Sequence, residues 1–256
     1  MRYVDPHIVV EKHLNGRQMP KWTIAIMCFH SKEKTLVIAK QFGATLLGYR
    51  VFSKCDESVV FQAKLNGVTV GILGWCTGGG PLVASRVEEL AVLGVKYIIG
   101  IGAAASITPK IDIQSIVLAT GYQLNDGVSC CYDPISKESH IDPYMYLIFS
   151  KVMQRMTCKV LDVKAGTIEA IYLQDERVLA PLRKENCEIV NWEISPFYTV
   201  SNHCKIKALW FGHISDLEFK GKWIDWYCNR ENTFQECISI CMKVVELLIE
   251  GEKNES

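Results

Sequence analysis

The 256-residue sequence lacks a net charge, because 28 Lys and Arg residues balance 28 Asp and Glu residues. Proteins that bind a nucleic-acid backbone or an anionic membrane surface normally concentrate positive charge. The balance therefore argues against both kinds of partner. Apolar residues make up 49% of the sequence and charged residues 22%. This composition favours a folded globular core over disorder.

Long apolar segments and paired cysteines are also missing. No uninterrupted apolar run approaches the roughly 20 residues that cross a bilayer as a helix. No apolar segment follows a basic start at the N-terminus, so we expect no secretory signal. None of the 11 cysteines belongs to a CxxC pair, the spacing typical of zinc sites. We expect a cytoplasmic protein with reduced cysteines that uses no metal and no other cofactor.

Apolar segments of strand length alternate with segments of helical periodicity. The predicted strands are residues 23–29, 47–53, 57–64, 68–75, 95–101, 116–121, 160–167, 188–192 and 207–214. The predicted helices are residues 33–40, 82–93, 144–156, 176–184 and 232–249. This order, with an Asn66-Gly67 hairpin turn, predicts a three-layer α/β/α sandwich around a mixed central β-sheet. We expect a single domain over residues 1–256, in which residues 1–20 form an N-terminal extension.

A glycine-rich segment, residues 100–105, follows the strand predicted at 95–101. Its sequence matches the GxGxxA pattern of dinucleotide-binding proteins, which should open a helix. Residues 106–112 instead lack helical periodicity and contain Pro109, which argues against that interpretation. Two other interpretations of residues 100–105 are a closely packed loop of small residues and a loop whose backbone N–H groups bind an anion or a sugar.

Four segments carry motifs that occur together, in this order, in one enzyme family. Residues 76–106 combine a glycine-rich turn, a helix with a Glu-Glu-Leu sequence, an apolar strand and the second glycine-rich segment. Residues 166–168, 190–195 and 213–216 supply the other three. Over roughly residues 22–250 the sequence resembles the family of purine and uridine phosphorylases and methylthioadenosine/S-adenosylhomocysteine nucleosidases. The resemblance implies a homo-oligomer, a dimer or a hexamer, that cleaves the N-glycosidic bond of a small-molecule nucleoside.

The resemblance assigns roles to two carboxyl groups. Asp216 is expected to donate a proton to N7 of a departing purine. Glu193 is expected to accept hydrogen bonds from the ribose hydroxyls and to stabilise the oxocarbenium-like transition state. Gly102, Ala103 and Ser215 lie in the matching segments and are expected to contact the substrate. From the residues alone, the favoured alternative is that Asp216 caps the next segment and Glu193 is a solvated turn residue.

The base and sugar pockets depart from the family pattern. Tyr172 and Gln174 stand where the family usually has an aromatic and an acidic residue. We expect Tyr172 to stack on the base and Gln174 to bind its edge through hydrogen bonds. Trp192 replaces a methionine that contacts the ribose, which implies an unusual sugar or 5′ substituent.

The phosphate site departs further. Phosphorylases of the family use a Gly-Asp-Pro-x-Arg loop after the first strand, an arginine before the second glycine-rich loop, and a hydroxyl residue within that loop. This sequence has residues 28–33, Gly100 and Ala103 at those places. Without guanidinium and hydroxyl partners a phosphate dianion binds poorly. We therefore expect hydrolysis, with Glu33 at the position of a nucleosidase glutamate that orients water, although a solvated helix glutamate is the alternative for Glu33.

Three other hypotheses stay open. The first is a nucleoside phosphorylase with a non-standard phosphate site that uses Lys32 or Lys34. The second is a catalytically impaired nucleoside-binding or storage protein, and the third is a dinucleotide-dependent enzyme. His30 and His213 lie near the proposed site, where a structural role is the alternative. By analogy with some relatives, His7 is a candidate to contact the sugar in a neighbouring subunit.

Overall fold

A computed structural model describes residues 3–53, 55–123, 126–224 and 231–255. The strands are β1 (Ile24–Cys28), β2 (Thr45–Leu46), β3 (Val60–Leu65), β4 (Val68–Leu73), β5 (Tyr97–Ser106), β6 (Ile116–Gln123), β7 (Glu138–His140), β8 (Val160–Thr167), β9 (Ile189–Asn191), β10 (Lys207–Phe219) and β11 (Lys222–Ile224). The helices are α1 (Pro6–Leu14), α2 (Lys32–Gln41), α3 (Gly79–Val92), α4 (Gly127–Tyr132), α5 (Pro143–Met153), α6 (Glu176–Lys184), α7 (Ile194–His203) and α8 (Glu231–Glu255). Two 3₁₀ turns are η1 (Glu57–Val59) and η2 (Ile171–Leu173).

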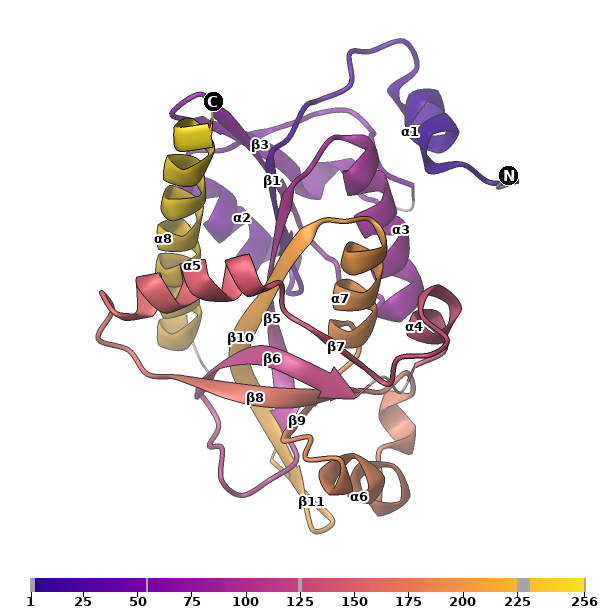
Figure 1. Cartoon of the computed structure of the whole chain (residues 1–256), viewed down its shortest axis with the longest axis vertical. Helices are drawn as coiled ribbons and strands as arrows, with labels where there is room; N and C mark the ends of the chain where they lie inside the picture. Colours follow the sequence, from indigo (N-terminus) through magenta and orange to yellow (C-terminus); the bar gives the residue numbers. More distant parts are fainter. Residues whose placement is uncertain (1–2, 54, 124–125, 225–230, 256) are drawn as a thin grey trace.

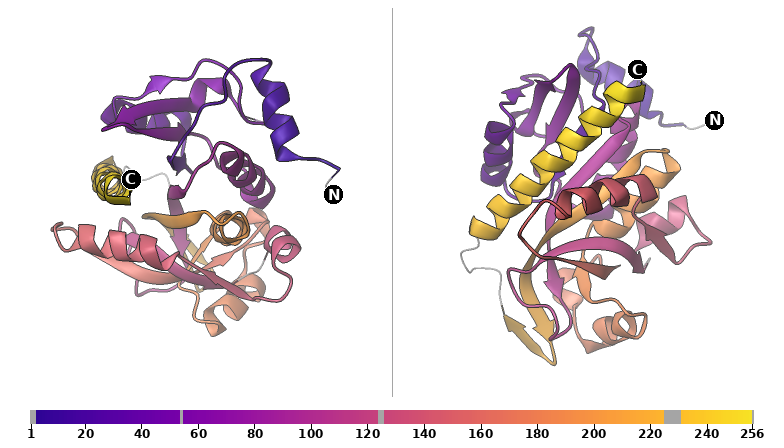
Figure 2. Two further views of the ribbon diagram at one scale, coloured as in Figure 1. Left: turned by 45° about the horizontal axis from the view of Figure 1, so that its top comes forward. Right: turned by 60° about the vertical axis from the view of Figure 1, so that its left-hand side comes forward.

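All these strands belong to one mixed sheet, and helices cover both of its faces (Figure 1). Helix α8 lies on one side of the sheet, and α3 and α7 lie on the other (Figure 2). The strand order is β11-β10-β6-β8-β9-β5-β1-β4-β3-β2, with β7 beside β6. The α/β sandwich around a mixed sheet predicted from the sequence is confirmed.

Strand β10 pairs with two neighbours and thereby closes part of the sheet on itself. It runs parallel to β5 and antiparallel to β6. Strand β8 joins β6 to β9, and β9 returns to the end of β5. The carboxyl-terminal halves of β5 and β10 therefore lie side by side and are held by neighbours on both edges.

The long C-terminal helix shows how the apolar pattern builds the core. The residues predicted on its apolar face are all buried, namely Cys237, Ile240, Cys241, Val244, Val245 and Leu248. On the opposite side of the sheet, α3 buries Val83, Val87 and Leu90. Near the N-terminus, α1 buries Val10 and Leu14, so this helix contributes to the core. Across the described residues, every helix is too short or too polar to cross a bilayer.

One expectation about local structure is wrong, and one disfavoured alternative is excluded. Residues 47–53 form an irregular connection in place of a strand. Val51 and Phe52 are nevertheless fully buried, so their apolar character serves packing without strand pairing. The dinucleotide hypothesis also fails, because β5 continues to Ser106 and the described residues 107–115 form turns and irregular backbone. The helix that would receive a pyrophosphate at its N-terminus is therefore not formed.

Candidate active site

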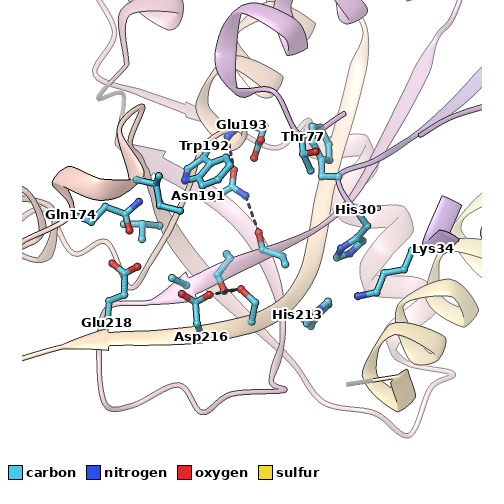
Figure 3. Close-up of a pocket in the computed structure, with 17 residues that line it drawn as sticks. His30, Lys34, Thr77, Gln174, Asn191, Trp192, Glu193, His213, Asp216 and Glu218 are labelled. Carbon is cyan, nitrogen blue, oxygen red and sulfur yellow. Dashed lines mark hydrogen bonds between the residues drawn. The ribbon is translucent and has the colours of Figure 1, made fainter. Parts of the chain in front are cut away.

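A cavity of about 700 Å³ lies at the carboxyl ends of the parallel strands β1, β5 and β10. Its walls come from the segment after β1, from Thr77 after β4, from residues 103–105 of β5, from residues 190–193 and from β10 (Figure 3). In α/β sheets this edge is the usual place for a ligand. Three of the four sequence motifs, those at residues 76–106, 190–195 and 213–216, therefore contribute to one cavity.

A β-bulge in β10 brings three polar side chains to the cavity. Ile214 pairs with Ala104 and Asp216 pairs with Ala105, which leaves Ser215 as the extra residue. A bulge breaks the strict alternation of side chains along a strand. Ser215 and Asp216 both line the cavity as a result, and Glu218, one alternation further, lines it too.

The carboxyl group of Asp216 is buried and held from both sides. Its side chain is 3% exposed. Ser215 Oγ donates to one of its oxygens, and Trp223 Nε1 donates to the other at 3.0 Å. These contacts fix the orientation of the Asp216 carboxyl group on the cavity wall.

Glu218 stands beside Asp216 and bonds to Gln174. With its amide nitrogen turned toward Glu218, Gln174 donates to both carboxylate oxygens, at 2.6 and 2.8 Å. Burial, and to a smaller extent the negative charge of Asp216, raise the pKa of Glu218 to about 7. This end of the cavity thus offers two carboxyl groups and an amide, the groups that recognise the edge of a base.

Glu193 occupies the corner between β9 and α7. Asn191 builds this corner: its Oδ1 accepts from the backbone N–H groups of Glu193, at 2.5 Å, and Ile194, at 3.0 Å. Its Nδ2 donates to the carbonyl oxygen of Ala103 at 2.8 Å and so ties the corner to β5. Asn191 thereby satisfies the first N–H groups of helix α7.

The Glu193 carboxyl group is available to a ligand. Its side chain is 3% exposed, and Oε1 has no hydrogen-bond partner among the described residues. Burial raises the pKa of Glu193 to about 7, opposed by hydrogen bonds from the backbone of Gly79 and Trp192. A buried carboxyl group with an open oxygen can accept a hydroxyl or stabilise a developing positive charge.

The far end of the cavity is basic. His30 follows β1, Lys34 belongs to α2 and His213 belongs to β10, and all three side chains line this end (Figure 3). The two imidazole rings stack, with centroids 5.3 Å apart and planes inclined by 13°. One end of the cavity therefore carries two carboxyl groups, and the other carries Lys34 and two imidazole rings.

The family model for the phosphorylase superfamily matches residues 23–248. The chain belongs to this superfamily. The resemblance seen in the sequence motifs is thereby confirmed, and three of the four motifs line the cavity described above.

Relatives of known sequence span only part of the chain. An uncharacterized protein of Acanthamoeba polyphaga mimivirus, R802, is 27% identical over 139 residues, or 54% of this chain and 53% of that protein. The chain thus spans about half the length of this relative. A DeoD-type purine nucleoside phosphorylase from Buchnera aphidicola is 25% identical over 65% of this chain and 72% of its own length. Uridine phosphorylase from Escherichia coli is 34% identical over 31% of each chain.

Solved structures match almost the whole chain. An AMP nucleosidase from Bacteroides thetaiotaomicron superposes with a TM-score of 0.75 at 18% identity, covering 97% of this chain and 99% of that one. A uridine phosphorylase from Vibrio fischeri gives 0.71 at 18% identity, covering 96% and 94%. At this identity the likeness establishes a common fold.

Most of the expected site residues of this superfamily member line the cavity. They are Ala103, Gln174, Trp192, Glu193, Ser215 and Asp216. Gly102 lies in the interior of β5, where an added Cβ would stand 2.8 Å from Trp210 Cζ2. The glycine at position 102 is therefore required by packing against an indole ring.

Besides Gly102, three expected residues lie outside the cavity lining. Glu33 is exposed in the first turn of α2, where a hydrogen bond from Ser31 lowers its pKa. The next residue, Lys34, lines the cavity in its place. Tyr172 is 97% exposed and lines an adjoining hollow, while Ile171 faces the cavity. His7 is exposed on α1.

The sequence analysis did not identify Thr77, Asn191 and Glu218. Glu218 follows Asp216 by two residues, so strand alternation carried past the predicted end of β10 would have identified it. Thr77 follows a buried strand at the same sheet edge, which is also a usable signal. The hydrogen bonds of Asn191 join β9 to β5 and have no local pattern in the sequence.

Proposed function

We propose that this protein cleaves the N-glycosidic bond of a nucleoside, with a purine as the favoured base and water as the favoured attacking group. The observation that carries the proposal is that Glu193, at the start of α7, and Asp216, on β10, are two buried carboxyl groups that line one cavity. The named activities of the sequence relatives, purine nucleoside phosphorylase and uridine phosphorylase, support a nucleoside as the substrate.

Asp216 and Glu218 would contact the base. As the N–C bond breaks, negative charge builds on the base, and a carboxyl group that donates a proton or a hydrogen bond lowers the barrier. Asp216 is proposed to donate to N7 of the purine. Glu218 and Gln174 lie beside it and would bind the neighbouring edge of the ring.

Glu193 would contact the ribose and stabilise its transition state. The ribose becomes an oxocarbenium-like cation in the transition state, and an ionised carboxylate stabilises that cation more than the neutral ground state. Oε1 of Glu193 is the free acceptor for a ribose hydroxyl or for the attacking water. Asn191 holds the corner that carries it. Trp192 forms the adjoining wall.

Water is favoured as the nucleophile because the family's phosphate contacts are replaced. Phe29 lines the cavity where the phosphate loop would begin, and Ala103 offers a methyl group where the family has a hydroxyl. Glycine occupies position 100 in place of arginine. A phosphate dianion gains most of its binding from such charge-assisted contacts.

Phosphorolysis is the second candidate, and a specific observation favours it. Lys34 supplies a positive charge to the cavity and Thr77 supplies a hydroxyl group. Together they could bind phosphate in a non-standard manner.

A panel of nucleosides and nucleotides, each incubated with and without phosphate, tests the proposal through release of free base on chromatography. The same panel is scored by melting temperature, because a ligand bound only by the folded state raises it. Base release that Glu193→Gln or Asp216→Asn abolishes supports the enzyme. Ligands that raise the melting temperature without releasing base would support a nucleoside-binding protein instead.

A further inference from the structure

A second hollow adjoins the cavity of the candidate active site. It has a volume of about 610 Å³ and lies between the segment of η2 and α6 on one side and the β10–β11 hairpin on the other (Figure 1). This volume is within the roughly 300–1,000 Å³ typical of small-molecule sites. Ile171, Gln174 and Glu218 line both spaces. The two spaces therefore meet at the end of the cavity where Gln174 and Glu218 face each other (Figure 3).

The lining of the second hollow is largely apolar. Its aliphatic and aromatic side chains are Ile171, Tyr172, Leu179, Phe219 and Trp223. Two acidic residues of this lining, Asp175 and Glu176, each pair with an arginine: Arg177 lies 2.5 Å from Asp175, and Arg183 bonds to Glu176. Lys222 is exposed to solvent. Because a buried charge needs a partner, this lining suits an uncharged, apolar group.

Two aromatic rings of the second hollow are in contact with solvent. Tyr172 is almost fully exposed, and about half of the Trp223 side chain is exposed. Large apolar side chains that gather on a surface commonly mark an interaction site. A ligand that fills the hollow would remove both rings from water, which favours its binding.

Trp223 connects the second hollow to the proposed acid of the reaction. It pairs with Glu218 in the β10–β11 ladder, and its Nε1 donates to Asp216 at 3.0 Å. Glu218 follows Asp216 by two residues along β10, so both side chains project from the same face of the strand. The second hollow therefore opens beside the Asp216 carboxyl group, on the side of Glu218.

The chemistry of a purine then indicates which atom is directed toward this opening. N7 and the substituent at position 6 lie on the same edge of the ring. With N7 at Asp216, position 6 is directed toward Glu218 and Gln174. A substituted amino group at position 6 keeps one N–H. Glu218 can accept this N–H in addition to the bonds from Gln174, because a carboxylate has about four acceptor sites.

We propose that the second hollow is a specificity subsite for an aromatic or branched apolar group carried on the position-6 nitrogen of the purine. The inference rests on the proposed function, since it takes the base to be a purine with N7 at Asp216. It goes beyond that function because an unmodified purine would leave Tyr172 and Trp223 exposed. The substrate class that follows is a purine nucleoside with an enlarged, apolar position-6 substituent.

Calorimetric titration with three nucleosides tests the proposal. The probes are adenosine, N6-benzyladenosine and N6-(2-hydroxyethyl)adenosine, whose substituent is polar. N6-benzyladenosine should bind about tenfold or more tightly than adenosine, because the phenyl ring leaves water. The hydroxyethyl compound should bind no more tightly than adenosine, because its hydroxyl group loses hydrogen bonds to water in an apolar hollow.

Alanine variants locate the bound substituent. The measured quantity is the ratio of the dissociation constants of adenosine and N6-benzyladenosine. Phe219→Ala and Tyr172→Ala should each lower this ratio about threefold or more, through loss of an aromatic contact. Leu173→Ala is the matched control and should leave the ratio unchanged, since Leu173 is exposed in the same turn η2 and lines neither space.

The melting temperature of each unliganded variant reports on folding. Because Tyr172 is almost fully exposed, Tyr172→Ala tests the proposal even if Phe219→Ala lowers the stability of the protein. A ratio near one in the wild-type protein, or a ratio that neither variant lowers, would overturn the proposal. Failure of all three probes to bind would overturn it as well.

The titrations need no turnover, so this inference and the proposed function fail separately. A protein that prefers N6-benzyladenosine through Phe219 or Tyr172 and releases no base contradicts the proposed function alone. A protein that cleaves adenosine and shows no preference for the benzyl group contradicts this inference alone.

Discussion

Gly100 of β5 is paired with Trp210 of β10, and the indole ring occupies the space that a side chain at position 100 would need. A Cβ atom built on Gly100 would stand 2.6 Å from Trp210 Cδ1. Trp210 is completely buried, so it cannot move aside without opening the core. The arginine that family phosphorylases carry at this position is therefore excluded by packing.

Gly100→Ala should destabilise the protein by about 1–3 kcal/mol, the usual cost of an added methyl group in a filled core. Chemical denaturation measures the change. Gly127→Ala is the control, because a Cβ there would meet its nearest atom at 3.7 Å, an ordinary contact. Equal free energies of unfolding for the two variants would show that the indole yields easily.

Asp216→Asn should lower turnover about 100-fold or more, the usual contribution of general acid catalysis. The substitution keeps the shape of the side chain, so substrate affinity should change much less. Steady-state kinetics on the best substrate of the panel measures both quantities. Near-normal turnover in Asp216→Asn would remove Asp216 from the mechanism and leave Glu218 as the candidate acid.

The raised pKa of Glu193 predicts a dependence of stability on pH. The folded protein holds a proton on Glu193 up to about pH 7, whereas the unfolded chain releases it near the ordinary value of 4.5. The contribution of Glu193 to the free energy of unfolding is therefore full below about 4.5 and is lost as the pH rises through 7. A shift of this size corresponds to about 3 kcal/mol.

Urea denaturation at pH 5 and pH 8 tests this dependence. The wild-type protein should lose more stability between the two pH values than Glu193→Gln, whose side chain does not titrate. The comparison isolates Glu193, because Glu218 and the other titrating groups are common to both proteins. Equal losses in the two proteins would contradict a proton held on Glu193.

Glu33→Gln should retain turnover within about twofold of wild type, because Glu33 is exposed and lies outside the lining of the cavity. The nucleosidase pattern in the sequence leads to the opposite expectation, a loss of activity. Steady-state rates of the variant decide between them. A large loss of turnover would mean that α2 changes position when substrate binds.

The α/β sandwich with a mixed sheet and the two carboxyl groups could be predicted from patterns in the sequence. Buried strands show as continuous apolar runs, and Glu193 and Asp216 fall in motifs next to such runs. The end of β10 was missed because Ser215 and Asp216 are consecutive polar residues that interrupt the apolar run, whereas the bulge at Ser215 lets the strand continue to Phe219. A bulge changes the alternation without leaving a sequence signal.

The orientation of helix α2 was equally hard to predict. Which of Glu33 and Lys34 faces the cavity depends on where the helix begins and how it rotates. The apolar residues of α2 do not determine which residue faces the cavity, because they are not all buried: Leu36 is 45% exposed, whereas Ile38 is fully buried. Tyr172 presents the same difficulty: in the short turn η2, the direction of each side chain depends on tertiary contacts.

The sugar product formed in phosphate-free buffer tests the central claim most directly. With the best substrate of the panel, we predict release of free base together with ribose, or 5′-substituted ribose, at a rate that added phosphate does not raise. Asp216→Asn should reduce that rate about 100-fold. Absence of base release from every nucleoside and nucleotide would contradict the account, and formation of ribose 1-phosphate at a rate that falls to zero without phosphate would contradict hydrolysis.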